Sequence, residues 1–193
     1  FNKHGMADKS NIQYWSGGGR LFGIDKYEKT LLDVVKRGNI KLVFSVKLEE
    51  IDGANKRARF TGFGEANKGQ EYMVDYEFIH VTPPQSPPDF VKNSPLANAG
   101  GWVDVDQFSL QHKKYPNVFS LGDSAGLPTA KTGAAIRKQT PVVATNLLAY
   151  MHKQPLKAAY NGYSSCPIVT GYGKLMLAEF GYNNEVMETF PFD

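Results

Sequence analysis

The sequence lacks the features that mark several protein classes. It has a single cysteine, Cys166, which excludes an internal disulfide and a cysteine-rich zinc module. It has no run of about 18 apolar residues, the length that a membrane-spanning helix needs. The 22 Lys and Arg residues outnumber the 19 Asp and Glu residues only slightly, and they are scattered. A nucleic-acid surface, which would cluster basic side chains, is therefore not expected.

Several site motifs are also missing. The four histidines (His4, His80, His112 and His152) show no metal-ligand spacing, so we expect no metal site and predict that each is a surface or packing residue. The glycine run at 16–23 follows a predicted strand, but Phe22 stands where a dinucleotide fingerprint needs a small residue. No nucleophile elbow or P-loop is present. These absences argue against metal-dependent and serine-nucleophile chemistry and against NAD binding at the glycine run.

Helical and strand patterns alternate along the chain. Before residue 82 the patterns predict a helix over 26–36, with Asp25 as N-cap and Gly38 as the C′ residue, and a β-hairpin around Asp52-Gly53. A long helix over 132–150 follows later, with a kink at Pro141. Its predicted apolar face consists of Ala135, Ile136, Val142, Val143, Leu147 and Leu148. The predicted strands are 11–15, 40–46, 46–51, 57–63, 72–81, 102–105 and 117–121. This order predicts an α/β class with at least one partly parallel sheet and an inserted hairpin or meander.

A proline-rich stretch over 82–95 divides the chain into two predicted domains, 1–95 and 96–193. Its prolines cannot donate to a strand ladder, which makes it a natural linker. The alternative is a surface loop inside one domain.

Residues 118–133 carry the first candidate site. An apolar strand delivers Asp123 at its carboxyl end, and Gly122 lets the backbone turn and approach a ligand closely. Lys131, Thr132 and Gly133 then open a helix whose first N–H groups carry partial positive charge. This arrangement suits a ligand that becomes anionic, such as a reduced flavin. The alternative is an ordinary strand–turn–helix joint.

Cys166 is the second candidate. It lies in Ser164-Ser165-Cys166-Pro167, where the flanking residues are small and Pro167 restricts the backbone. A thiolate beside a flavin can attack sulfur species and pass electrons into the ring. The alternative is a small buried hydrophobic side chain, the usual role of a lone cysteine.

Together these segments resemble the sulfide:quinone oxidoreductases, in particular their mitochondrial-type branch and its bacterial relatives. The resemblance extends over essentially the whole chain, and the segments around Cys166 and Lys131 are its most specific parts. It is carried by residues 80–88, 101–106, 115–119, 121–123, 127–133, 162–172, 177–180 and 188–193.

The resemblance implies the C-terminal half of a flavoprotein with two dinucleotide-binding, Rossmann-like domains. Residues 1–95 would then be the later part of the second, NAD-like domain with its linker, and residues 96–193 the C-terminal part of the FAD domain. It implies that Asp123 contacts the ribityl–phosphate part of FAD, that Lys131 lies at the isoalloxazine ring, and that Gly122, Thr132 and Gly133 complete the cofactor site. Cys166 matches one of two redox cysteines that take up sulfide sulfur.

The implied partners are sulfide, a sulfur acceptor and a membrane quinone. The implied location is peripheral, at a bacterial or mitochondrial inner membrane, through segments outside this chain. The second cysteine, the N-terminal glycine fingerprint and the membrane-docking helix of the family are not in these 193 residues. We therefore expect the isolated chain to bind FAD weakly or not at all and to be inactive. The alternatives are the flavin subunit of a cytochrome-linked sulfide dehydrogenase and a non-catalytic α/β partner-binding module.

Overall fold

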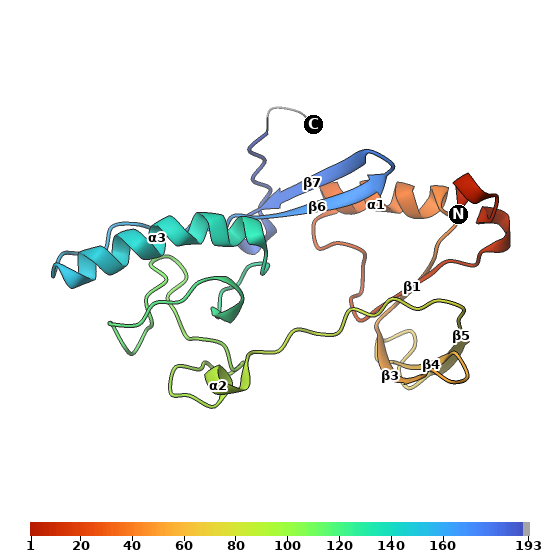
Figure 1. The fold of residues 1–193 in the computed structure, drawn as a ribbon, viewed down its shortest axis with the longest axis horizontal. Coiled ribbons are helices and arrows are strands. Elements are labelled where there is room, and N and C mark those ends of the chain that lie inside the picture. The colour runs from red at the N-terminus through yellow and green to blue at the C-terminus, as the bar shows by residue number, and fades with distance from the viewer. Residues whose placement is uncertain (191–193) are drawn as a thin grey trace. The chain divides into compact units, whose positions relative to one another are not determined.

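The computed structural model describes residues 1–190 and divides the chain into two compact units, Phe1–Pro83 and Pro84–Asp193 (Figure 1). The division falls inside the proline-rich stretch that the sequence marks as a linker. That stretch is not wholly irregular, because it contains the short helix α2 (Asp89–Lys92). Each unit is described separately below. Residues 191–193, which belong to the last segment of the family resemblance, lie outside the described residues.

The first unit begins with a β–α–β arrangement. After two short 3-10 turns, η1 (Asn2–His4) and η2 (Ala7–Lys9), strand β1 (Gln13–Ser16) leads through helix α1 (Asp25–Arg37) to strand β2 (Lys41–Phe44). Strands β1 and β2 pair in parallel, with Trp15 opposite Val43. This confirms the predicted helix to within one residue at each end and the predicted parallel pairing.

The ends of α1 differ from the prediction. Ile24 occupies the N-cap position, and Asp25 lies inside the first turn, where its carboxylate is 2.6 Å from the Arg20 guanidinium. Gly38 has φ −83° and stays in the right-handed region, while Asn39 takes the positive φ of 47°. Asparagine tolerates this conformation better than most residues. It therefore turns the chain where we had assigned the turn to glycine.

An antiparallel meander completes the first unit. Strands β3 (Val46–Asp52), β4 (Arg57–Gly62) and β5 (Glu71–Asp75) lie in that order, and the Asp52-Gly53 hairpin is confirmed. The prediction of a strand up to residue 81 is wrong, because β5 ends at Asp75 and residues 76–81 form no strand. The apolar residues of the sequence continue to residue 81, but the partner strand does not extend that far. Asp75 pairs with Arg57, the first residue of β4, so β4 offers no partner for the residues that follow.

One residue, Ser45, separates the two sheets of this unit. The sequence predicts a single strand over 40–46, but β2 ends at Phe44 and β3 begins at Val46. Ser45 between them has φ 55°, so the chain turns sharply there. Its N–H donates to the Gly18 carbonyl at 3.0 Å, and its carbonyl accepts from the Phe63 N–H at 2.9 Å.

The core of the first unit is an apolar cluster under the meander. Val46, Ala58 and Phe60 are buried, and partly buried side chains from β1, β2 and β5 pack around them. The Trp15 ring stacks on Phe60 with 4.6 Å between centroids. Through Trp15, the parallel pair and the meander share one core.

The second unit contains one long helix, one hairpin and much irregular backbone. It comprises η3 (Gly122–Ser124), α3 (Gly133–Met151), the antiparallel strands β6 (Ser164–Gly171) and β7 (Lys174–Phe180), and η4 (Tyr182–Asn184). The strands predicted over 102–105 and 117–121 are wrong. Those segments form only isolated bridges, such as Val103 with Ala125 and Gln111 with Phe119. The β6–β7 hairpin was not predicted.

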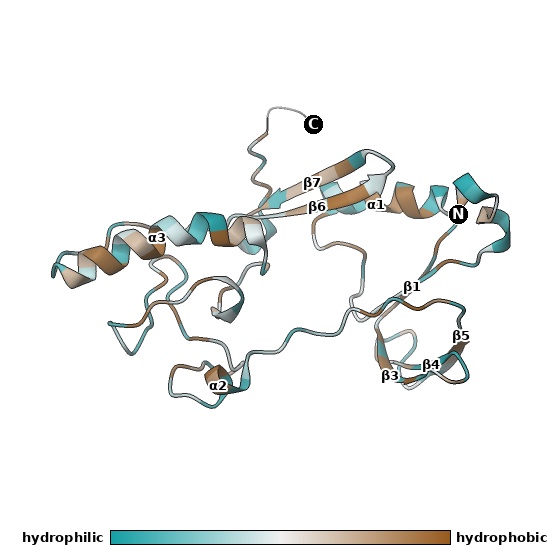
Figure 2. Ribbon diagram, viewed as in Figure 1, coloured by the Kyte–Doolittle hydropathy of each residue, from teal (hydrophilic) through white to brown (hydrophobic). Residues whose placement is uncertain are grey.

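Helix α3 confirms the predicted helix, but only part of its predicted apolar face is buried. Ala135, Gln139, Val142 and Asn146 are buried, at the 4–3–4 spacing of one helical face. The expected apolar residues Leu147 and Leu148 are exposed. Figure 2 shows hydrophilic and hydrophobic segments alternating along this helix. Pro141 lies inside the helix as predicted. None of the described helices is long and apolar enough to span a membrane.

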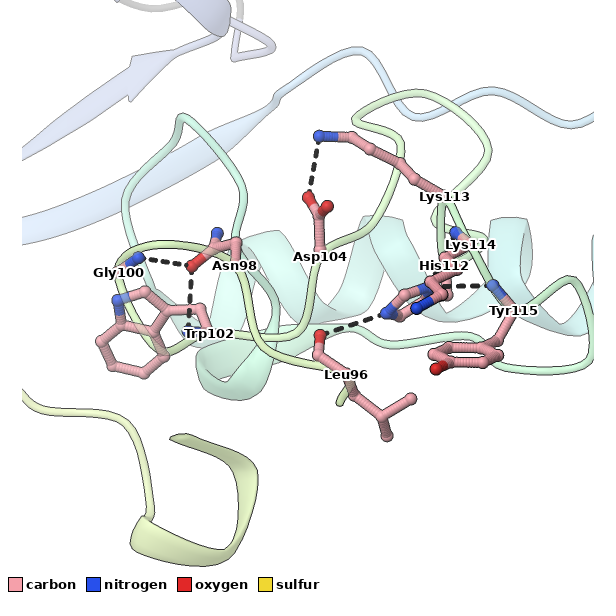
Figure 3. Close-up of polar contacts among 9 residues, drawn as sticks. All are labelled: Leu96, Asn98, Gly100, Trp102, Asp104, His112, Lys113, Lys114 and Tyr115. Atoms are coloured by element: carbon pink, nitrogen blue, oxygen red, sulfur yellow. Dashed lines mark hydrogen bonds and ion pairs between the residues drawn. The ribbon is translucent and has the colours of Figure 1, made fainter. Parts of the chain in front are cut away.

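Polar side chains shape the irregular segment before α3. The Nε2 of His112 donates to the Leu96 carbonyl at 3.1 Å, and its Nδ1 accepts from the N–H groups of Lys114 and Tyr115 at 2.9 and 3.1 Å (Figure 3). His112 is buried, which confirms it as a packing residue. With both ring nitrogens engaged, it ties segments 16 residues apart.

Candidate functional site

Gly122 and Asp123 lie at the turn η3, against the first half of α3. Gly122 has φ +67°, and a Cβ at this position would come within 3.2 Å of the Ile136 side chain. Its N–H donates to the Oε1 of buried Gln139 at 2.7 Å. The turn is thereby fixed to the helix, and Asp123 projects from it as an exposed residue.

Lys131 folds back over the same turn. Its Nζ donates to the carbonyl oxygens of Asp123 and Ala125 at 2.7 and 2.8 Å, and it lies 4.0 Å from the centroid of the Trp102 ring. Burial lowers the pKa of Lys131, and the negative charge of Asp123 opposes that shift in part. The sequence places a positive charge at the helix start. The structure shows that this charge is held against the loop 123–125.

Thr132 caps α3. Its Oγ1 accepts from the Ala135 N–H at 3.1 Å and is hydrogen-bonded to the Ser164 hydroxyl at 2.8 Å. Gly133, the first helical residue, is exposed, and a Cβ placed there would meet nothing within 4 Å. The start of the helix is therefore open to a ligand, and partial positive charge accumulates at this end.

Cys166 is joined to this helix start through the first residues of β6. Ser164 bonds Thr132, and Thr129 Oγ1 donates to the Gly162 carbonyl at 2.9 Å. Cys166 lies two residues beyond Ser164 on the same strand, so both side chains are on one face of the hairpin, roughly 7 Å apart along it. The structure thus brings Cys166 to the neighbourhood of Thr132, although 33 residues separate them along the chain.

Cys166 is a free, partly buried cysteine opposite Ala178 of β7. Burial raises the pKa of its thiol above the ordinary value. The thiolate is the nucleophilic form, so the described residues alone hold Cys166 in its less reactive, protonated form.

A polar cluster that was not predicted from the sequence lies on the opposite face of the same hairpin. The Tyr163 hydroxyl donates to the buried Glu179 carboxylate, which also accepts from the N–H and hydroxyl of Thr189 at 2.8 and 2.5 Å. Burial by itself would raise the pKa of Glu179, but these hydrogen bonds outweigh it and the pKa is lowered. Ser165 Oγ, on the residue opposite Glu179, is buried without a partner among the described residues.

Gln139 and Asn146 were missed as well, although a signal for them exists. They complete the 135–139–142–146 spacing of the buried face of α3, which a pattern of apolar residues alone does not reveal. No comparable signal marks Glu179 or Trp102, because nothing in the sequence states which distant groups they meet.

These residues fit a flavin site in two respects. The start of α3 is open at Gly133, and Lys131 supplies a cation beside the loop that carries Asp123. The space left by the missing Cβ of Gly122 is taken by Ile136 of α3. The assignment of Gly122, Asp123, Lys131, Thr132, Gly133 and Cys166 as site residues stays a prediction. Among residues 1–190, no group of three or more His, Cys, Asp or Glu side chains could hold a metal ion.

The chain is similar along its whole length to known proteins. It is 42% identical over 193 residues to the mitochondrial sulfide:quinone oxidoreductase of Mus musculus, covering 100% of this chain and 42% of that protein. No protein-family model matches. The chain therefore spans less than half the length of the curated relatives it matches. The predicted resemblance to the sulfide:quinone oxidoreductases is confirmed, whereas the expectation that these residues form the C-terminal half is not.

Solved structures show the same fold. The sulfide:quinone oxidoreductase of Aquifex aeolicus superposes with a TM-score of 0.74 at 21% identity, over 86% of this chain and 41% of that one. This confirms the predicted partial, Rossmann-like flavoprotein fold of α/β class. A chain in the mitochondrial ATP synthase of Tetrahymena thermophila superposes with a TM-score of 0.78 at 28% identity, over 91% of this chain and 42% of that one.

Proposed function

We propose that this chain forms part of a flavoprotein that oxidises sulfide and passes the electrons to a membrane quinone. The observation that carries the proposal is the 42% identity to a sulfide:quinone oxidoreductase over all 193 residues. That span includes Cys166 and the Lys131 segment, the parts of the sequence that composition alone does not explain. In this proposal the 193 residues are one part of the enzyme, as their share of the relative's length suggests.

FAD is the cofactor of the proposal, and when bound it accepts the two electrons that sulfide releases. Gly122, with its φ of +67°, would form the turn that presents Asp123, and Asp123 would accept hydrogen bonds from the hydroxyl groups of the cofactor. Lys131 places positive charge near the ring, and the start of α3 adds the partial charge of its N–H groups. Fixed charges of this kind favour the anionic, reduced form of the ring.

Cys166 is the sulfur-handling residue of the proposal, as one member of a pair whose second cysteine lies outside these 193 residues. Sulfide sulfur is taken up at the pair as a persulfide, and two electrons leave through the flavin to the quinone. Because burial raises the pKa of the Cys166 thiol, the described residues do not activate it. Activation then falls to the bound cofactor or to groups outside the chain.

The proposed location follows from the quinone. A membrane-soluble acceptor requires a peripheral contact with the membrane, at the mitochondrial inner membrane if the source is eukaryotic and at the bacterial inner membrane otherwise. We assign that contact to segments outside these residues. We also propose that the 193-residue chain alone retains little FAD and no turnover, since it would supply only one side of the cofactor site.

The test uses the complete gene product that contains this chain. Sulfide-dependent reduction of a soluble quinone is measured for the wild type, for Cys166→Ser and for Tyr172→Ser, a control at the exposed tip of the same hairpin. We expect Cys166→Ser to lose about 100-fold or more in rate, as removal of a nucleophile does, and the control to keep its rate. Unchanged activity in Cys166→Ser would remove the redox role. Electron delivery to cytochrome c but not to quinone would favour a cytochrome-linked dehydrogenase.

A second candidate is a non-catalytic module that binds protein partners. The likeness to a chain of the Tetrahymena ATP synthase favours it, because that protein belongs to a large assembly. It predicts a gene product without bound flavin and without sulfide oxidation, whose assembly is unaffected by Lys131→Ala. Absorbance of the purified gene product near the flavin bands separates the two candidates directly.

A further inference from the structure

Trp102 has no role in the proposed function, yet its ring lies against a residue that does. The Lys131 Nζ is 4.0 Å from the centroid of the Trp102 ring, well within the range of a cation–π interaction. The same Nζ donates to the carbonyls of Asp123 and Ala125. An ammonium has three donors. Two carbonyls and one aromatic face therefore replace most of the water that burial removes from around the Lys131 ammonium.

Asn98 holds the backbone of Trp102 through both its N–H and its carbonyl. Asn98 Oδ1 accepts from the N–H groups of Trp102 and Gly100 at 3.1 and 2.9 Å (Figure 3). The Trp102 carbonyl accepts from the Asn98 N–H at 2.7 Å, and Gly101 takes φ +84° at the turn. The position of the ring thus follows from a tight loop closed by one asparagine.

The next residue fixes this loop to the carbonyls that bind Lys131. The Val103 N–H donates to the Ser124 carbonyl at 2.9 Å, and the Val103 carbonyl accepts from the Gly126 N–H at 2.9 Å. Val103 thereby forms a parallel bridge with Ala125. The aromatic ring and the two carbonyls belong to segments that are hydrogen-bonded to each other. Together they form one preassembled binding site for the ammonium.

From this geometry we infer that Trp102 is a positioning residue, which holds the Lys131 ammonium against the 123–125 loop and so keeps a positive charge beside the proposed flavin site. This inference rests on the proposed function for the identity of the ligand. Without the ring, the long and flexible lysine side chain would be free to leave the loop and return to water. With the ring, the side chain is ordered before the cofactor binds.

The first experiment tests the contact itself. The gene product is labelled with lysine carrying carbon-13 at Cε, and the Lys131 signal is assigned from its loss in Lys131→Arg. A ring current shifts the Lys131 ε-protons upfield. We expect Trp102→Leu to abolish that shift, Trp102→Phe to keep part of it, and Phe78→Leu, at an exposed aromatic, to leave it unchanged. An unchanged Lys131 signal in Trp102→Leu would overturn the inference.

The second experiment tests the consequence for the cofactor, by titrating the flavin-free gene product with FAD and recording the flavin absorbance. We expect Trp102→Leu to bind FAD roughly two- to fivefold more weakly, the equivalent of an exposed cation–π interaction, and Trp102→Phe to recover most of the loss. A lost ring-current shift with unchanged FAD affinity and absorbance would also overturn the inference. A wild-type gene product that takes up no FAD would instead overturn the proposed function, while the first experiment still judges the contact.

Discussion

The two units of the chain hold their shape in different ways. In the first, an apolar cluster of sheet residues around Phe60 forms the core, and the ion pairs between neighbouring strands are exposed. In the second, half of the buried face of α3 is polar, and single side chains such as Asn146 and His112 fix long irregular segments. A unit built on sheet periodicity needs few such contacts. A unit with long irregular segments needs many, because such segments have no strand ladder to hold them.

The largest expected effect belongs to the apolar core of the first unit. Phe60→Ala removes a buried ring stacked on Trp15, so we expect a loss of about 3 to 4 kcal/mol in the free energy of unfolding. Urea unfolding is followed by Trp15 fluorescence in a Trp102→Phe background. Phe78→Ala, at an exposed ring, serves as the control and should change little. A loss below about 1 kcal/mol for Phe60→Ala would contradict the apolar account of this unit.

Asn146 provides the matching test in the second unit. Its amide donates to the carbonyls of Ser109 and Ala158 at 3.0 and 2.8 Å and accepts from the Ala158 N–H at 3.1 Å. Asn146→Leu would leave these buried backbone groups without partners, at an expected cost of about 3 kcal/mol. The reporter is Trp102 fluorescence in a Trp15→Phe background, and Leu148→Asn, at an exposed position of the same helix, is the control. A neutral or stabilising Asn146→Leu would show that shape alone holds these loops.

Glu179 allows the polar contacts of the second unit to be tested through the pH dependence of stability. Its pKa is lowered in the folded chain, so it contributes stability that is present above the unfolded pKa and lost as pH falls through the folded pKa. We expect Glu179→Gln to cost about 2 kcal/mol at neutral pH, because it replaces a charged acceptor of several hydrogen bonds. This difference from wild type should shrink as the pH falls below about 4.5. Denaturation at several pH values measures it, with Glu185→Gln, at an exposed residue, as control. A gap that does not vary with pH would rule out the charged form.

The smallest effect concerns the reactivity of Cys166. Because burial raises the pKa of its thiol, alkylation by iodoacetamide should require a higher pH than alkylation of a small-molecule thiol. The rate measured between pH 7 and 10 in the 193-residue chain should still be rising where the free thiol has levelled off. Cys166→Ser is the blank. A midpoint below that of the free thiol would mean that the described residues do activate this cysteine.

The same contrast explains what could be predicted from the sequence. Helix α1 and the Asp52-Gly53 hairpin followed from periodicity and turn chemistry, which act over a few residues. The β6–β7 hairpin was missed because Pro167 argues against a strand. In this two-stranded sheet β6 has a free edge, where a missing N–H donor is tolerated. The segments around Val103 and Phe119 have the composition of strands, which is why strands were predicted there. Each pairs with its neighbours only at single bridges, so no strand forms.

The candidate site divides in the same way. Gly122, Asp123 and the start of α3 were marked by a local pattern of apolar residues, turn and helix, although the predicted strand before the turn does not form. The approach of Cys166 to that helix depends on hydrogen bonds between distant residues, such as Thr132 with Ser164, which are 32 residues apart, and Thr129 with Gly162. The seat of Lys131 on Trp102 is likewise a long-range contact. Neither could be inferred from residue types alone, because each depends on how separate loops are closed.

Ser45, the one residue between β2 and β3, has a left-handed backbone conformation and limits where insertions and deletions can occur. Ser45 connects a parallel pair to an antiparallel meander with no spare residue, while its backbone bonds Gly18 on one side and Phe63 on the other. Because successive strand side chains face opposite ways, one inserted or deleted residue here would exchange the inner and outer faces of β3 and expose Val46. Length changes in related chains should therefore gather in the loops on either side, and the count between Lys41 and Asp52 should stay constant.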